Sequence, residues 1–420
     1  MFKVFLASWA LLLGMMLLML GNGIQGTLLG IRGSIEGFAT WQMSVVMSAY
    51  FAGFLLGSQI APGMIQRVGH VRVFAALGSM VSAVLVLYAA APDWMVWSGL
   101  RVVIGFCFAG VYVTAESWLN NAATNETRGQ TLSLYMIVQM VGIIAAQGLL
   151  NLADPGGYEL FVIASVLVSL AFTPILLSIS PAPGFSTAKS MGLMKLFRTS
   201  PLGCVGIFIM GGVYSALFGM AAVWGALVGL SVLEISTFVA SIYLGGLLFQ
   251  YPIGALSDRM DRRQLIIGVA GLCALAALMG AALSLPFAML LGVALLIGGL
   301  ANPLYSLLLA HTNDFLQADD MAGASGGLLF MNGIGAVAGP LVLGWMIDVV
   351  GPPGFFLFIT ILCALLVAYG MWRMTRRAAP EVADQGSYTP LTPSASVVTL
   401  DAAFEQAQPD EGEGAHATAR

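Results

Sequence analysis

The sequence predicts an all-α polytopic membrane protein whose helices form two pseudo-symmetric six-helix bundles, and three observations support this prediction. Hydrophobic residues make up 59% of the 420 positions and charged residues only 9%, whereas charged residues are about a quarter of an ordinary soluble domain. The apolar residues gather in twelve runs, each near the roughly 20 residues that a helix needs to cross a bilayer. A short charged gap that begins at Gln66 recurs 192 positions later, where it begins at Asp258.

The twelve runs are separated by short polar or proline-containing gaps. Pro92 and Pro286 each split two long runs at nearly equivalent places of the two halves, which predicts a tight hairpin in both. The first run follows Lys3 as the apolar part of a signal peptide would, but no small-residue cleavage site follows it, so we keep it as a span. The predicted spans are residues 4–26, 42–63, 72–92, 94–118, 129–151, 158–179, 201–226, 234–254, 264–284, 286–310, 321–347 and 354–374.

The basic residues predict the orientation of the protein in the membrane. Of the sixteen Lys and Arg residues, thirteen flank the spans on the side of the N-terminus and only Arg32 lies on the other side; Arg101 lies inside a span and Arg420 ends the chain. Short loops rich in Lys and Arg stay in the cytoplasm. Both termini are therefore predicted to be cytoplasmic, which requires an even number of spans.

Four segments are predicted along the chain. Residues 1–180 form the first bundle, residues 181–200 a cytoplasmic linker and residues 201–377 the second bundle. In the linker, apolar residues around Leu196 lie beside Lys195 and Arg198 and predict one short interfacial helix. Residues 378–420 are predicted to be a disordered cytoplasmic tail, because their composition offers too little apolar surface to fold. A spacer is the simpler interpretation of this tail, and a regulatory segment is the alternative.

The second charged gap carries a motif, which reads Gly-x-x-x-Asp-Arg-x-x-Arg-Arg from Gly254 to Arg263. It resembles the loop signature of the major facilitator superfamily, with Asp261 in place of the usual Gly. The first copy departs further, since Pro62 stands for the leading Gly and Gln66 for the Asp. The inner-gate contacts of the first half are therefore expected to be weaker or differently arranged.

A second motif lies between the fourth and fifth spans, where Ala115-Glu116-Ser117-Trp118-Leu119-Asn120 is followed by Thr127-Arg128-Gly129. It resembles the YcaD-like branch of the same superfamily, and the resemblance covers nearly the whole chain up to Arg377. The resemblance implies the major facilitator fold, a bacterial inner-membrane location, and secondary active transport of a small solute by alternating access of two rocking bundles. It does not identify the solute.

The internal repeat continues inside the spans. Four pairs of residues match at a spacing of 193 positions: Gly105 with Gly298, Tyr112 with Tyr305, Gln139 with Asn332, and Gly142 with Gly335.

The fourth span carries a stripe of candidate functional residues. Arg101, Gly105, Phe108, Tyr112 and Glu116 are spaced by 4, 3, 4 and 4 residues, so they share one helix face. Charged groups are costly inside a bilayer and tend to face a wet cavity or the bundle interior. Arg101 is therefore predicted to bind an anionic or carbonyl-bearing solute; tying helices together through buried carbonyls is the alternative. An Arg on this helix also resembles the family's fourth-helix motif, which has been associated with proton coupling.

Glu116 lies near the basic end of the fourth span, too far along the helix to pair with Arg101, since fifteen residues at about 1.5 Å each separate them by roughly 22 Å. Three roles are open. The resemblance implies a latch in which Glu116 pairs with Arg67 or Arg72 and holds the inner gate shut, and this is the leading hypothesis. Glu116 as a protonatable coupling site and plain solvation of a helix end are the alternatives.

The predicted site combines the stripe with mid-span polar residues on helices that line the superfamily's central pathway. The predicted substrate cavity consists of Arg101, Tyr112, Gln139, Asn302, Tyr305 and Asn332. The predicted cytoplasmic gate consists of Arg67, Arg72, Asp258, Arg259, Arg262 and Arg263. Contacts of such gate charges with carboxylates and helix ends break when the bundles rock. The alternative is that these charges only fix the topology of the spans.

Other classes of protein fit the sequence less well. The only histidines, His70, His311 and His416, lie at loops, helix ends or the tail, and no catalytic set emerges, so an enzyme is disfavoured. The four cysteines lie inside predicted spans and are interpreted as packing residues, so neither a metal nor a cofactor is expected. The expected partners are a small-molecule solute, the lipid bilayer and, if transport is coupled, protons; we expect a monomer that binds no nucleic acid. A non-transporting sensor or scaffold with the same fold is the alternative function.

Overall fold

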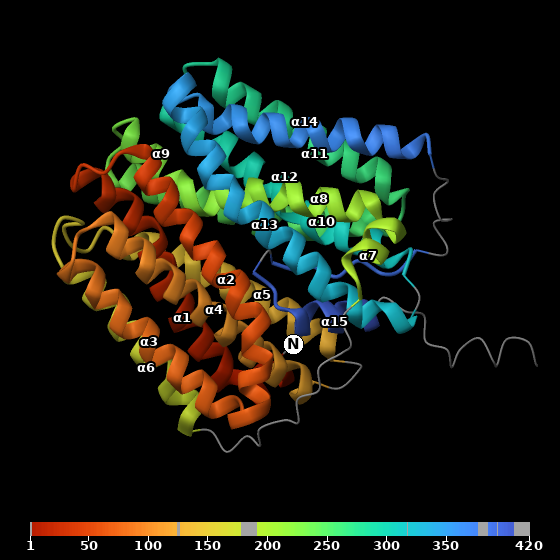
Figure 1. Cartoon of the computed structure of the whole chain (residues 1–420), viewed down its shortest axis with the longest axis horizontal. Helices are drawn as coiled ribbons and strands as arrows, with labels where there is room; N and C mark the ends of the chain where they lie inside the picture. The colour runs from red at the N-terminus through yellow and green to blue at the C-terminus, as the bar shows by residue number, and fades with distance from the viewer. Residues whose placement is uncertain are drawn as a thin grey trace, which may run out of the picture.

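A computed structural model of the protein shows two bundles of long helices (Figure 1). It describes residues 2–123, 127–177, 191–316, 318–376, 385–392 and 394–406. The first bundle consists of α1 (Phe2–Ile35), α2 (Thr40–Val68), α3 (His70–Ala90), α4 (Trp94–Ala122), α5 (Arg128–Leu149) and α6 (Glu159–Leu177). The second consists of α8 (Pro201–Ser215), the π-helical turn η1 (Ala216–Met220), α9 (Ala221–Leu227), α10 (Val232–Ser257), α11 (Arg262–Ala282), α12 (Phe287–Asn313), α13 (Ala318–Val350) and α14 (Gly354–Met374). Two short helices lie outside the bundles, α7 (Leu193–Thr199) and α15 (Val397–Gln406).

The prediction of twelve spans in two bundles is confirmed. Within the described residues, eleven helical stretches are long and apolar enough to cross a membrane, with α8, η1 and α9 forming one of them. The twelfth is α6, an apolar helix of 19 residues. The bounds differ most in α1, which runs to Ile35 instead of ending near residue 26. It continues because Arg32 in its last turn binds Glu36 at 2.7 Å and donates to the carbonyl of Pro155 at 3.1 Å, which satisfies the polar end.

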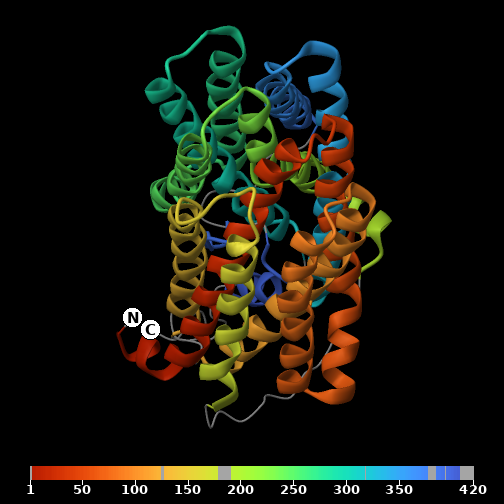
Figure 2. The same cartoon turned by 90° about the vertical axis from the view of Figure 1, so that its left-hand side faces the viewer.

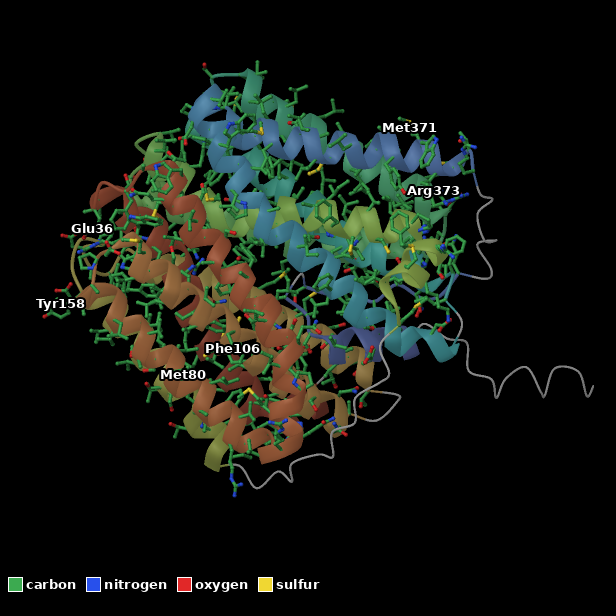
Figure 3. All side chains as sticks on the ribbon, in the orientation of Figure 1. Glu36, Met80, Phe106, Tyr158, Met371 and Arg373 are labelled. Carbon is green, nitrogen blue, oxygen red and sulfur yellow. The ribbon has the colours of Figure 1, made fainter. Side chains whose placement is uncertain are left out.

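The side chains on the outside of the bundles are those expected of a surface in contact with lipid. Large apolar side chains are exposed there, among them Met80 on α3 and Met371 on α14, which Figure 3 labels. The cysteines, by contrast, are buried inside the bundles as free thiols, in agreement with their interpretation as packing residues.

The two bundles repeat the same close helix crossings. In the first bundle, Gly105 of α4 faces the carbonyl oxygen of Tyr50 on α2, and in the second, Gly298 of α12 faces the carbonyl oxygen of Ile242 on α10. A Cβ atom at either glycine would lie inside van der Waals contact with that oxygen. Gly105 and Gly298 are 193 positions apart, and the residues that they face, Tyr50 and Ile242, are 192 apart. Equivalent helices of the two bundles therefore make equivalent contacts, as expected of an internal repeat.

The two faces of the membrane domain differ in charge. The face that carries Arg67 at the end of α2 and Arg262 at the start of α11 is here called the basic face, and the face that carries Arg32 is called the opposite face. Figure 2 shows the second bundle, coloured green to blue, above the first bundle, coloured red to yellow. They touch toward the opposite face, where α1 packs on α9 and α5 on α10.

Hydrogen bonds between the bundles support this closure. Ser48 of α2 donates to the carbonyl oxygen of Val337 on α13 at 2.6 Å. Asn151, just after α5, donates to the hydroxyl of Ser236 on α10 at 3.2 Å. The bundles are therefore joined on the opposite face.

The chain returns between the bundles on the basic face after its last span. α15 lies between α5 and the first turns of α13 (Figure 1) and also packs against α4. This differs from the prediction of a disordered tail: Leu400 and Phe404 are 0% and 3% exposed. The segment offers little apolar surface of its own, and it is buried because α4, α5 and α13 pack against it.

The linker contains the predicted short helix, which is α7, with Leu196 buried. Residues 181–190 of the predicted linker, and residues 378–384, 393 and 407–420 of the predicted tail, lie outside the described residues.

Candidate functional site in the central cavity

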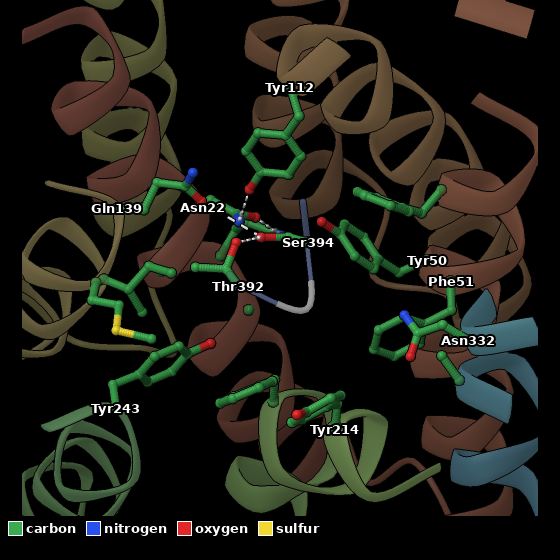
Figure 4. A pocket seen from close by; sticks show the side chains of 18 of the residues that line it. Asn22, Tyr50, Phe51, Tyr112, Gln139, Tyr214, Tyr243, Asn332, Thr392 and Ser394 are labelled. Carbon is green, nitrogen blue, oxygen red and sulfur yellow. Dashed lines mark hydrogen bonds between the residues drawn. The ribbon is translucent and has the colours of Figure 1, made fainter. Parts of the chain in front are cut away.

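A cavity lies between the two bundles at the level of their mid-span residues (Figure 4). It contains about 1240 Å³ of space free of atoms, a volume that includes the part open to solvent. Its polar lining includes six amide side chains, which are Asn22, Gln25, Gln139, Gln147, Asn302 and Asn332. Its aromatic lining includes Tyr50, Tyr112, Tyr214, Phe218 and Tyr243.

Five of the six predicted cavity residues line this space. They are Arg101, Tyr112, Gln139, Asn302 and Asn332. The sixth, Tyr305, does not line it. Its ring is fully buried and meets the ring of Tyr214 edge-on, with centroids 6.0 Å apart, while its backbone N–H donates to the Tyr214 hydroxyl at 3.2 Å. Tyr214 thus stands in the lining where the prediction placed Tyr305.

Arg101 is held in place by groups of the first bundle. Its guanidinium donates to Gln25 Oε1 at 3.0 Å and lies over the ring of Tyr50, with Cζ 4.7 Å from the centroid. Gln25 in turn donates to Asn22 at 3.0 Å, and Asn22 to the Tyr112 hydroxyl at 3.4 Å. The guanidinium is therefore oriented by a chain of neutral groups, and its positive charge is not neutralised by any carboxylate among the described lining residues.

Several polar atoms of the lining have no hydrogen-bond partner in the described part of the chain. These buried atoms are Arg101 Nε, Gln139 Nε2, Asn302 Oδ1 and Asn332 Oδ1. They include donors and acceptors from both bundles. An unsatisfied buried polar group costs about 1–3 kcal/mol, so their gathering around one cavity is a property expected of a ligand site.

Some lining residues were not predicted from the sequence. Tyr50 on α2 and Tyr243 on α10 both point into the cavity in Figure 4. They lie 193 positions apart, one residue off the spacing of 192 at which these two helices match, so the internal repeat gave no signal for them. Thr392 and Ser394 come from the tail, and nothing in the spans points to them.

Glu116 does not form the predicted latch with Arg67 or Arg72. Its carboxylate is buried and accepts hydrogen bonds from the Tyr135 hydroxyl at 3.2 Å, the Ser396 backbone N–H at 2.8 Å and the Thr399 hydroxyl at 2.6 Å. Two of these three donors belong to the tail. Both arginines are exposed, at the end of α2 and the start of α3, while the tail reaches Glu116 from between the bundles. A latch that forms when the basic face closes stays a prediction.

Comparison with known proteins decides the family. The sequence matches the family described as Major Facilitator Superfamily over residues 11–239 and 203–404. The chain belongs to the Major Facilitator Superfamily. An uncharacterized MFS-type transporter of Yersinia enterocolitica is 28% identical over 338 residues, which are 79% of this chain and 86% of the relative. The uncharacterized MFS-type transporter YcaD of Escherichia fergusonii is 27% identical over 336 residues, with the same shares of the two chains.

Solved structures of the superfamily share the fold. The chain is similar to two crystal structures of the nucleoside transporter NupG, with TM-scores of 0.75 and 0.73 and sequence identities of 14% and 15%. The first similarity covers 87% of this chain and 99% of the NupG chain, and the second 88% and 98%. The resemblance to this superfamily and to its YcaD-like members is thus confirmed.

The two copies of the superfamily loop are built differently here. Gly69 closes the first loop with φ of 86°, a conformation that favours glycine. In the second loop Asp261 replaces the usual glycine with an ordinary φ of −56° and caps α11, because its side chain accepts from the Arg263 backbone N–H at 2.9 Å. The substitution therefore exchanges a glycine turn for a helix cap.

The predicted gate residues of the second loop bind within their own bundle or to the tail. Arg262 is almost completely buried and pairs with Asp314, at the end of α12, at 2.6 Å. Burial raises the pKa of the Asp314 carboxyl, and the Arg262 guanidinium opposes that shift. Asp258 accepts from the Tyr388 backbone N–H of the tail at 2.9 Å, while Arg259 is exposed.

Arg263, the last of the predicted gate residues, pairs with Asp261 at 3.2 Å. Among the described residues, no ion pair of these loops joins one bundle to the other.

Proposed function

We propose that this protein is a secondary active transporter that moves a small solute across the membrane by rocker-switch alternating access. The observation that carries the proposal is the cavity between two repeated bundles, lined by buried polar atoms that have no partner among the described residues. Closure of the bundles on the opposite face is the arrangement expected of one end state of such a cycle.

The lining suggests the chemistry of the solute. Amide groups donate and accept hydrogen bonds, tyrosine rings stack on flat groups, and Arg101 favours a carbonyl or an anion. A planar, hydrogen-bonding solute that is neutral or negatively charged fits this set best. NupG, whose fold is similar, is a nucleoside transporter, so nucleosides are the first solutes to test.

The basic face is proposed to be the cytoplasmic face of a bacterial inner membrane, because Lys and Arg gather there. Proton coupling is a secondary proposal. It rests on the burial of Glu116 and Arg101 inside the membrane domain, where a change of surroundings alters the protonation of a carboxylate.

The test is a thermal-shift screen of the purified protein against nucleosides, nucleobases, aromatic carboxylates and sugars, since a ligand of the folded protein raises its melting temperature. Compounds that bind are then tested as radiolabelled solutes in proteoliposomes. Binding and uptake should both be lost in Asn332→Ala and retained in Ser79→Ala, a change on the exposed surface of α3. Binding without uptake would instead support the sensor, and a screen without any bound compound would contradict the proposed cavity function.

A further inference from the structure

The tail is bound to both bundles, and its first part binds the second bundle. Arg262 donates to the carbonyl oxygen of Gly386 at 2.7 Å. Leu391, only 3% exposed, donates from its backbone N–H to the Ser306 hydroxyl at 3.0 Å, and that hydroxyl donates back to the Leu391 carbonyl at 3.2 Å. This part therefore follows α12 from its end toward the cavity.

The next part of the tail crosses to the first bundle. Thr392 and Ser394 line the cavity, and Ser394 donates to Gln139 on α5 at 3.5 Å (Figure 4). Two residues later the chain reaches Glu116 on α4, which Ser396 and Thr399 bind. The tail thus spans the gap between the bundles at the level of the cavity.

We propose that residues 386–392 and 394–404, here called the C-terminal wedge, hold this transporter in an inhibited state. The inference rests on the proposed function and adds the regulation of the same site. The bundles are already joined on the opposite face, and the wedge lies across the approach from the basic face. A solute can leave toward the basic face only when the wedge moves.

The wedge also blocks the conformational change. Alternating access requires the bundles to come together on the basic face. α15 lies between them there, and a helix with its side chains is about 10–12 Å wide. The bundles therefore cannot close on that face until the wedge has left, so both solute release and the return step depend on it.

The contacts of the wedge suit a reversible element. α15 has only ten residues, and isolated helices shorter than about 12–15 residues are marginal in water. Its order therefore depends on docking. The wedge buries a few apolar side chains, Leu400 among them, and also binds through hydrogen bonds to the single side chains of Glu116 and Ser306. These hydrogen bonds are exchanged for water on release.

The test measures access to the cavity and does not require the solute. Asn332→Cys places a thiol on α13, where Asn332 lines the cavity (Figure 4). The purified protein in nanodiscs is treated with a charged, membrane-impermeant maleimide, and the parent chain, whose cysteines are buried, gives the background. A chain ending at Arg377 should react at least tenfold faster than the full chain, while a chain ending at Gln406, which keeps the wedge, should react like the full chain.

A full-length variant guards against misfolding of the truncated chain. Leu400→Asp places a carboxylate at a fully buried position of α15, should release the wedge, and should also raise the alkylation rate at least tenfold. Equal rates in the full chain, the chain ending at Arg377 and Leu400→Asp would overturn the proposal. If the rates rise but the chain ending at Arg377 and Leu400→Asp, each made with Asn332 kept, neither transport nor bind any solute, the wedge stands and the proposed transport function fails.

Discussion

Replacing Gly105 by Ala should destabilise the protein, because α4 and α2 cross at this residue. The added methyl carbon would lie inside contact with the Tyr50 carbonyl oxygen, whereas carbon–oxygen contacts between helices are normally about 3.3–3.6 Å. The helices must therefore separate by on the order of 1 Å, and overpacking of this kind costs about 1–3 kcal/mol. Gly298→Ala should cost a similar amount, because the second bundle repeats the crossing at the Ile242 carbonyl.

Each helix contains its own control for this prediction. Gly99 of α4 and Gly292 of α12 have open space where a Cβ would lie. Alanine at these positions should have no steric cost and should stabilise the helix by up to about 1 kcal/mol through its higher helix propensity. Both substitutions in one helix gain this propensity, so they should differ by the steric cost alone, about 1–3 kcal/mol.

The assay uses the protein's own buried cysteines. A thiol-reactive dye that fluoresces on reaction reports the temperature at which they become accessible in detergent. For a unit the size of one bundle, 1 kcal/mol corresponds to about 2–4 °C, so Gly105→Ala and Gly298→Ala should each lower the melting temperature by on the order of 5 °C. Melting temperatures equal to those of Gly99→Ala and Gly292→Ala would refute the claim that these crossings depend on glycine.

Three further changes test the site and its surroundings. Arg101→Ala should abolish binding of any solute found in the screen while the protein stays folded, and Arg101→Lys should not restore binding, because an ammonium cannot reproduce the contacts of the guanidinium; unchanged binding would remove Arg101 from the site. Asp314→Asn should destabilise the protein by about 3–5 kcal/mol by leaving Arg262 buried without its partner, and Asp314→Leu with Arg262→Met should recover much of that loss in the same melting assay. Glu116→Gln should abolish the effect of a pH gradient on uptake in proteoliposomes if protons are coupled; full gradient-dependent uptake in this variant would end the coupling proposal.

The fold was predictable because its signals are local. Apolar runs of the right length specify the spans, and the recurrence of glycines at one spacing specifies the repeat. Gly142 and Gly335, matched in the sequence, face the backbones of Met16 and Phe208 in the two bundles, which are 192 positions apart. The register of the sequence repeat was therefore also the register of the helix contacts.

The cavity was predictable only in part. Mid-span amides and Arg101 stand out in the sequence because polar side chains are costly in hydrocarbon. They are therefore expected to face a cavity or the bundle interior. Tyr305 was misplaced because its counterpart Tyr112 meets Asn22, whereas Tyr305 meets Tyr214 at the equivalent position, and this larger ring separates it from the cavity. Such a difference between two repeats depends on the packing of a neighbouring helix.

The partner of Glu116 was not predictable, since a residue 280 positions later in the chain provides it. The sequence offered nearby arginines of suitable charge, and the tail carried no pattern that pointed to α4. Long-range docking of a short segment leaves little trace in composition.

A segment tethered beside its own binding site competes with every free molecule that seeks that site. Tethering can give a segment an effective concentration on the order of millimolar. A receptor that is open for only about 1% of the time shows a dissociation constant about a hundredfold weaker than its intrinsic one. Affinities measured on the intact polypeptide would then describe this competition as much as the fit of the molecule itself. Ligand searches would gain sensitivity from a shortened polypeptide, and a purification handle is better fused to the first residue than to the last.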